Sequence, residues 1–222
     1  MKVLVFDTET TGLPQRDENG KSPSFYDTTK WPHIIQFSYI LYDIDKNKIL
    51  VNHDHIIKLA KHVTISPESI AVHGITREQS EREGIPIEEA LELFHISMMN
   101  ADIIIAHNIS FDKQVVIVEC IRHRRAAPFK FKMPEQYFCT MKNTVELCKI
   151  ETISKKNGKT FFKYPTLSEL HQKMFEIVPQ NTHDSMVDIL VCLRCFLKLV
   201  YDIDICERNR KFRSYFRKIC PK

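Results

Sequence analysis

The 222-residue chain lacks several features that would place it in a specialised class of protein. Its seven cysteines are odd in number and show neither CxxC pairs nor zinc-finger spacing, which argues against a disulfide framework and a structural zinc site. No apolar segment has the length of a transmembrane helix, and there is no internal repeat, low-complexity tract or linker. What remains is an ordinary globular composition, 43% hydrophobic and 27% charged, for which one domain is expected.

The first residues do not resemble an export signal. The apolar run is short, and Asp7 and Glu9 interrupt it before any small-residue cleavage site. The scattered cysteines are then expected to be reduced, mostly buried thiols. We therefore expect an intracellular protein, cytoplasmic or nuclear and not secreted, with no membrane partner. The domain is expected over 1–200, with 201–222 as a basic C-terminal extension packed on it or trailing it.

Positive charge exceeds negative charge only slightly. The net charge of +4 is compatible with a polyanionic partner but requires none. Basic residues gather in two clusters, Arg122, His123, Arg124 and Arg125 with Lys130 and Lys132, and Arg208, Arg210, Lys211, Arg213, Arg217 and Lys218. Each cluster has two interpretations, a solvated helix end or tail, or a surface that contacts phosphates.

The hydrophobic pattern predicts strands first and helices later. Within residues 2–8, Val3, Leu4, Val5 and Phe6 are apolar at successive positions, as in a strand buried on both faces. Residues 14–33 break every periodicity and predict a long irregular loop. Residues 34–44 and 48–58 flank a turn at Asp45-Lys46-Asn47, which predicts a hairpin.

The rest of the chain alternates between helix and strand. Helices are predicted to begin near Pro67 and Pro86, and a short strand over 102–108 precedes a helix over 111–125. Two more helices are predicted over 167–175 and 185–200. This order indicates an α/β domain with a mixed central sheet.

Acidic residues follow two of the predicted strands. Asp7 and Glu9 are two residues apart on a strand and therefore project from the same face, an arrangement that a cation between them would stabilise. Asp112 lies where the strand over 102–108 passes into a helix, and ligands of open α/β sheets bind at the carboxyl ends of strands. The alternatives are a strand that ends in a polar turn at Gly12 and an acid that interacts favourably with a helix dipole.

A histidine and a further aspartate lie close together near the C-terminus. Asp188 is in the first turn of the predicted helix, and His183 is expected in the loop before it, with Asp184 as the helix N-cap. From that loop His183 could face the same cleft as Asp188. The alternative is a helix-capping segment with an incidental histidine.

Three motifs in this order, FDTETTGL over 6–13, AHNISFD over 106–112 and HDSMVD over 183–188, resemble those of the DEDDh (DnaQ-like) exonuclease superfamily. That superfamily includes the proofreading subunit of bacterial replicative DNA polymerase. The resemblance covers nearly the whole chain and implies a ribonuclease H-like fold, with a mixed five-stranded sheet flanked by helices. The five-residue step from His183 to Asp188 argues against the sister group, which has a tyrosine four residues before its last aspartate.

The resemblance implies catalytic and metal-binding roles for particular residues. Asp7, Glu9, Asp112 and Asp188 would hold two divalent metals, and His183 would act as general base. Oxygen ligands favour Mg²⁺ or Mn²⁺ over zinc, and a histidine is suited to accept a proton at neutral pH. The implied activity is 3′→5′ hydrolysis that releases nucleoside 5′-monophosphates from a single strand or 3′ end, with a polymerase as a candidate partner.

Substrate-binding candidates lie beside the acidic residues. The segment HGIT, which contains His73, resembles the family's loop next to the nucleotide pocket. Leu13 and Phe111 are placed to stack on the terminal base, and core packing is the alternative for Phe111. Thr10 and Asn108, within the first two motifs, complete the set.

The chain departs from the family pattern at Asp184 and Met186, where small residues are frequent, and in the long loop over 14–33. These departures leave the substrate open. DTETTG favours DNA, an RNA-processing exonuclease is the alternative, and a third possibility is a non-catalytic nucleic-acid-binding module. That module predicts a lost acidic residue, and none is lost.

Overall fold

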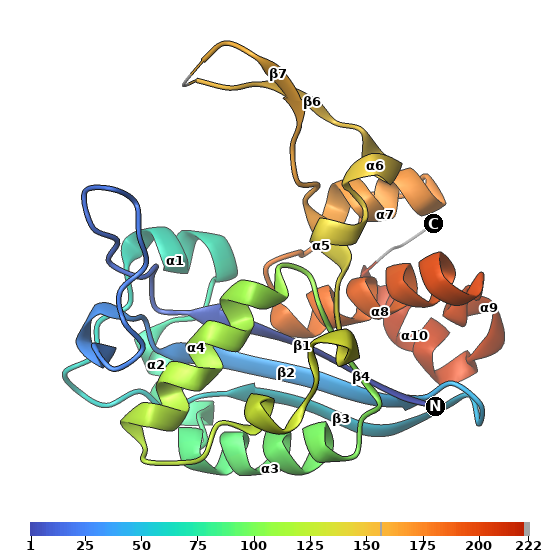
Figure 1. Ribbon diagram of the computed structural model, residues 1–222. Coiled ribbons are helices and arrows are strands. Elements are labelled where there is room, and N and C mark those ends of the chain that lie inside the picture. The colour runs from blue at the N-terminus through green and yellow to red at the C-terminus, as the bar shows by residue number, and fades with distance from the viewer. Residues whose placement is uncertain (156, 220–222) are drawn as a thin grey trace.

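The strand predicted near the N-terminus lies at the centre of the sheet in the computed structural model, which describes residues 1–155 and 157–219 (Figure 1). The strand order is β3-β2-β1-β4-β5. β1 is antiparallel to β2, which is antiparallel to β3, whereas β4 and β5 run parallel to β1. The strands are β1 (Lys2–Thr10), β2 (Ile34–Asp43), β3 (Lys48–Ile56), β4 (Ile103–Ala106) and β5 (Tyr137–Cys139). The predicted α/β fold with a mixed five-stranded sheet is confirmed.

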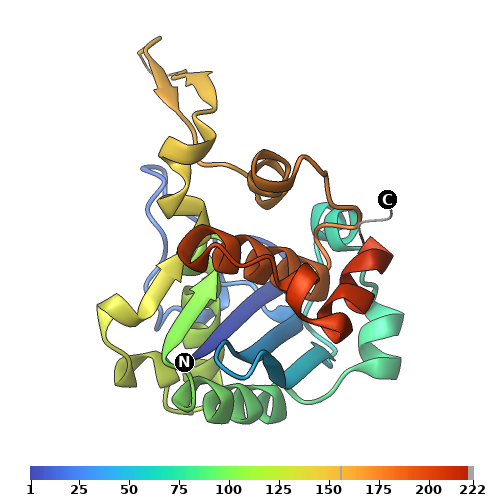
Figure 2. The same ribbon diagram turned by 90° about the vertical axis from the view of Figure 1, so that its right-hand side faces the viewer.

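Helices cover both faces of this sheet (Figures 1 and 2). On one face, α3 (Ile87–Met99) and α4 (Ile109–Arg122) pack with Leu4 and Phe6 of β1. On the other face, α8 (Ser185–Tyr201) packs with Val3 and Val5. Successive residues of a strand point to opposite faces, so the uninterrupted apolar run of β1 supplies both cores.

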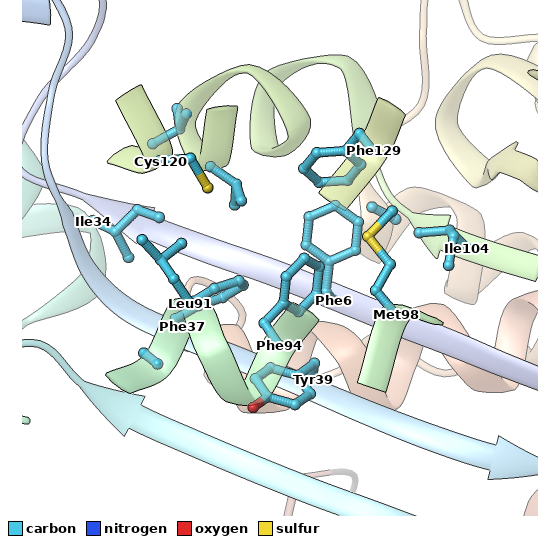
Figure 3. Close-up of a cluster of buried hydrophobic side chains, with 14 of the residues drawn as sticks. Phe6, Ile34, Phe37, Tyr39, Leu91, Phe94, Met98, Ile104, Cys120 and Phe129 are labelled. Atoms are coloured by element: carbon cyan, nitrogen blue, oxygen red, sulfur yellow. The ribbon is translucent and has the colours of Figure 1, made fainter. Parts of the chain in front are cut away.

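An aromatic cluster fixes α3 on the sheet (Figure 3). The ring of Phe94 lies 5.2 Å from that of Phe6, 4.8 Å from that of Phe37 and 5.3 Å from that of Tyr39, measured between centroids. All four side chains are almost fully buried, and burial of such a side chain stabilises the fold by about 1.5–3 kcal/mol. The cluster therefore packs α3 against β1 and β2.

The predicted helix starts agree with the structure. Ser66 caps α1 (Pro67–His73) and Asp184 caps α8 through their side chains. The helix predicted over 111–125 is α4, which begins and ends a few residues earlier. α7 (Leu167–Phe175) has a capping box, because Thr166 and Glu169 each accept a backbone hydrogen bond from the other.

Several short elements were not predicted. They are α2 (Arg77–Glu83), the 3-10 turns over Thr28–Lys30, Pro128–Phe131 and Pro134–Gln136, strand β5, α5 (Thr140–Asn143), α6 (Val145–Cys148), and a hairpin of β6 (Glu151–Ile153) and β7 (Thr160–Phe162). The hairpin forms a separate two-stranded sheet. Elements of three to seven residues are too short to show a hydrophobic period, which is why the sequence pattern did not reveal them.

The C-terminal residues continue the second core. After α8 come α9 (Ile205–Arg208) and α10 (Arg210–Ile219), whose Phe212 and Phe216 belong to the same buried cluster as α8. Residues 220–222 of the predicted extension lie outside the described residues. Within the described part of the chain, no helix is both long and apolar enough to cross a membrane.

Candidate active site

Four carboxylates from three elements meet at the C-terminal end of β1. Asp7 and Glu9 extend from β1, Asp112 lies in the first turn of α4, and Asp188 lies in the first turn of α8. α4 and α8 cover opposite faces of the sheet, and both begin beside the end of the same central strand (Figures 1 and 2). The fold thus brings together acids that are more than 100 residues apart in the sequence.

Asp112 is tied directly to β1. Its Oδ1 accepts hydrogen bonds from the Thr8 backbone N (3.2 Å) and from Thr8 Oγ1 (2.9 Å). Asp112 is buried, so these two bonds fix the orientation of its carboxylate while its other oxygen stays available. The sequence analysis missed Thr8 as a positioning residue. Thr8 lies between Asp7 and Glu9 in sequence and points to the opposite face of the strand, which was the available signal for a contact on that face.

His183 and Asp188 lie together beside Glu9. One ligand atom from each of these three residues lies within 4.8 Å of the other two. The His183 backbone N donates to Asp188 Oδ2 (3.2 Å), while Asp188 Oδ1 is buried and has no hydrogen-bond partner among the described residues. The expectation that His183 faces the same site from the loop before α8 agrees with this geometry.

The carboxylates are crowded enough to hold protons near neutral pH. Burial, with the charges of neighbouring acids, raises the pKa of Glu9 to about 8, and burial raises the pKa of Asp112 and of Asp188 to about 7. Burial and the Asp112 charge also raise the pKa of Asp7 well above its usual range. Crowding of like charges at low dielectric penalises the ionised forms.

This donor set fits divalent cations. Among the described residues, no lysine or arginine forms an ion pair with the four carboxylates, and Asp188 Oδ1 has no hydrogen-bond donor. An unpartnered buried carboxylate oxygen is costly unless a cation binds it. Because the available ligand atoms are mainly carboxylate oxygens, the site is suited to a hard cation.

The start of α8 is held against β2 by polar side chains that the sequence analysis did not identify. The Ser185 backbone N donates to Gln36 Oε1 (3.1 Å), and the Ser185 and Ser38 hydroxyls lie 2.5 Å apart. Gln36 Nε2 and Ser38 Oγ both donate to Asp54 Oδ1, at 2.9 and 2.8 Å. Gln36 and Ser38, polar residues two apart in an otherwise apolar strand, were the available signal, since buried polar groups require partners.

A hollow of about 580 Å³ adjoins the carboxylates. Thr10, Leu13, His73 and Phe111 line it together with Glu9. The Leu13 side chain is 79% exposed and is therefore accessible to a ligand. Asn108 is not among the lining residues and instead flanks the start of α4 in a left-handed conformation (φ 71°). The structure therefore groups four of the five substrate-binding candidates.

The first basic cluster does not serve as a phosphate surface at Arg122. That guanidinium donates to the backbone carbonyls of Thr28, Trp31 and Pro32, and it pairs with buried Glu119 at 2.9 Å. The phosphate-contacting interpretation is wrong for this residue, whose donors hold the end of the 14–33 loop on α4. Ten residues of helix also separate it from Asp112, a distance of about 15 Å.

Protonation and metal binding should compete at this site. Between an ordinary carboxyl pKa near 4 and the raised values of about 7–8, the folded protein holds protons that the unfolded chain has released. Without metal, these groups therefore make folding less favourable as pH rises through that window. Added Mg²⁺ or Mn²⁺ should reverse the loss at pH 8.

Thermal unfolding measures this linkage. At pH 8 in EDTA, Asp188→Asn is expected to have a higher Tm than the wild type, and the wild type should gain several degrees on addition of Mn²⁺, since 1 kcal/mol corresponds to about 2–4 °C in a domain of this size. The variant should gain less. A wild-type Tm that does not respond to either cation would contradict the metal-site assignment.

A central strand that ends in paired acids, with a further acid at the start of a helix on each face, defines a ribonuclease H-like nuclease fold. Residues 4–196 match the family described as Exonuclease (RNase_T), and the chain belongs to this family. The resemblance to DEDDh (DnaQ-like) exonucleases is thereby confirmed. A comparison with curated proteins gave no match.

Solved structures show the same fold at low sequence identity. One is E. coli exonuclease I in complex with a dT13 oligonucleotide, with TM-score 0.63 and 18% identity over 96% of this chain and 45% of the other. A second is the zinc-bound E. coli exonuclease I complex with single-stranded DNA, with TM-score 0.58 and 16% identity over 96% and 42%. A third is a 3′-exonuclease that recognises the histone mRNA stem-loop, with TM-score 0.62 and 14% identity over 92% and 65%. The chain thus spans less than half the length of these exonuclease I chains.

Proposed function

We propose that the protein is a 3′→5′ exonuclease that hydrolyses phosphodiester bonds at the 3′ ends of nucleic acid, preferentially single-stranded DNA, and releases nucleoside 5′-monophosphates. The convergence of four carboxylates and His183 at the end of β1, in a chain of the exonuclease family, carries this proposal. A non-catalytic binding module would have no need for four crowded acids with raised pKa values.

Asp7, Glu9, Asp112 and Asp188 would hold two Mg²⁺ or Mn²⁺ ions. When bound, such ions polarise the scissile phosphate, activate water and stabilise the leaving oxygen. The protein positions the acids through the Thr8 bonds to Asp112 and the His183 backbone bond to Asp188. His183, exposed beside Glu9 and Asp188, accepts the proton of the attacking water.

The hollow beside the carboxylates receives the terminal nucleotide. Leu13 offers an exposed apolar surface for the last base, and the ring of Phe111 lines the same hollow. His73 keeps its Nδ1 engaged with the Ile75 backbone N (3.0 Å), and burial lowers its pKa, so it is neutral at pH 7. The apolar part of the hollow suits a base, and the side that carries Glu9 suits the phosphate with its cations.

Directionality and substrate are tested together. Oligonucleotides of single-stranded DNA, duplex DNA and RNA, each labelled at the 5′ end, are incubated with purified protein and Mn²⁺ or Mg²⁺. We expect a ladder of progressively shorter labelled products and free nucleoside 5′-monophosphates, with single-stranded DNA degraded fastest. Release of labelled mononucleotide as the first product would reverse the direction and contradict the proposal.

RNA is the second candidate substrate, because one solved structure with this fold is a 3′-exonuclease that recognises an mRNA stem-loop. Faster degradation of RNA than of DNA in the same assay would assign the protein to RNA processing and leave the chemistry of the site unchanged.

A further inference from the structure

The β6–β7 hairpin projects away from the body of the domain. β6 and β7 pair only with each other, and Figures 1 and 2 show them extending beyond α5 and α6, above the 14–33 loop. A two-stranded sheet without a packed face is marginally stable by itself in water. The projecting hairpin, which we call the β6–β7 arm, therefore contributes little to the stability of the fold.

The arm holds the net positive charge of the chain. Residues 149–164 contain five of the 32 basic residues and one of the 28 acidic residues. The remainder carries equal numbers of each sign, so this segment accounts for the whole net charge of +4. Lys149, Lys155 and Lys159 are exposed, and Lys163 pairs with Glu169 at the base (2.6 Å). Such a surface attracts a polyanion.

Apolar side chains stand among these lysines on both faces of the arm. Ile153 is 68% exposed, Phe161 49%, Phe162 36% and Tyr164 56%. Phe161 lies opposite Thr152 and Phe162 opposite Glu151, so the two neighbouring rings point to opposite faces of the hairpin. Exposed rings between lysines are the combination that binds single-stranded nucleic acid, in which bases stack on rings and phosphates meet ammonium groups.

The base of the arm is fixed to the strand beside the active site. His107, directly after β4, lies 2.9 Å from Thr140 Oγ1 through Nδ1 and 3.0 Å from the Pro165 carbonyl through Nε2. Thr140 begins α5 on the outgoing path, and Pro165 follows the arm on the return path. One side chain at the carboxyl edge of the sheet thus contacts the chain before the arm, at Thr140, and directly after it, at Pro165.

We propose that the β6–β7 arm binds the single-stranded segment of the nucleic acid that lies 5′ to the nucleotides in the active site. The inference rests on the proposed function, because a strand that enters with its 3′ end at the carboxylates must leave the site toward its 5′ side. A protein strand would bind along one of the two open edges of the hairpin. The exposed lysines and rings instead favour a nucleic acid as the partner.

Binding without metal tests the arm independently of catalysis. Fluorescence anisotropy in EDTA measures the affinity of each protein for oligo-dT of about 16 nucleotides and of about 4 nucleotides. The proteins are the wild type, a ring variant (Phe161→Ala/Phe162→Ala) and a lysine variant (Lys155→Ala/Lys159→Ala). The ring variant should bind the long oligonucleotide about 5- to 100-fold more weakly with an unchanged salt slope. The lysine variant should lower the salt slope by about 0.7 for each lysine removed.

Short oligonucleotides and a matched surface variant serve as controls. kcat/KM for the 4-nucleotide substrate, measured with Mn²⁺, should be the same in the arm variants and the wild type. Lys46→Ala/Leu50→Ala, an exposed lysine and leucine at the β2–β3 hairpin, should leave both measurements unchanged.

The outcomes separate the two proposals. Unchanged affinity of both arm variants for the long oligonucleotide overturns the arm proposal and leaves the exonuclease proposal intact. Weakened binding together with absence of hydrolysis in the wild type supports the arm and overturns the exonuclease. A third outcome is that affinity is unchanged and that the wild type, but not the arm variants, self-associates in sedimentation. The arm would then bind a second copy of the chain, which also overturns the arm proposal.

Discussion

Neutralising any one of the four carboxylates is expected to abolish hydrolysis. Asp7→Asn, Glu9→Gln, Asp112→Asn and Asp188→Asn keep the shape of the side chain but remove a charge that the cations need, and we expect a fall in turnover of about 10³-fold or more, equivalent to about 4 kcal/mol. Isosteric substitutions are chosen because Asp112 is buried and bonded to Thr8. Turnover of a labelled oligonucleotide at saturating Mn²⁺ measures the loss.

The same variants should be folded and at least as stable as the wild type in EDTA, because each substitution removes repulsion within the crowded site. This outcome separates loss of a ligand from loss of the fold. Glu81→Gln, an exposed acid on α2, is the matched control and should keep full activity. Wild-type turnover in any of the four variants removes that residue from the site, and activity that survives EDTA contradicts the metal-dependent reaction as a whole.

Replacement of His183 is expected to lower kcat by about 10²- to 10⁴-fold while metal still binds. Asparagine is the better substitute, because His183 has a left-handed backbone (φ 77°) that asparagine adopts more readily than alanine. The backbone bond from residue 183 to Asp188 is retained in the variant. The defect should therefore appear in kcat and not in the affinity for Mn²⁺.

The pH profile distinguishes a general base from a structural residue. If His183 is the general base, the wild-type rate should rise with pH as the base loses its proton, and the variant should lack that limb. Because Glu9, Asp112 and Asp188 also titrate near pH 7–8 without metal, the profile is measured at two saturating Mn²⁺ concentrations. A limb that moves with metal concentration belongs to the carboxylates.

Asp184→Ala provides the comparison. It removes the side-chain cap of α8 and should lower stability by about 1 kcal/mol while the acid limb remains. If His183→Asn keeps the wild-type acid limb and shows only a similar loss of stability, His183 is a structural residue.

Local patterns in the sequence determined much of the fold and the members of the candidate site. The apolar run of β1 required a strand buried on both faces, and Ser66 and Asp184 marked the starts of two helices. These signals depend on a residue and its near neighbours, since strand period, capping and turn chemistry act over a few residues. Asp7, Glu9, Asp112, His183 and Asp188 were candidates because of their places at strand and helix ends, and the resemblance of three motifs to the DEDDh superfamily implied their roles.

Only the tertiary structure decided what distant residues do together. Arg122 belonged to a basic cluster in sequence, yet its guanidinium is used by three carbonyls of the 14–33 loop. Gln36 and Ser38 were two polar residues in an apolar strand until α8 supplied Ser185 as their partner. The lysines and rings of residues 149–164 lie on one hairpin because β6 pairs with β7, and His107 contacts the chain before and after it. Sequence spacing cannot give these contacts, because they join segments that the sheet topology brings together.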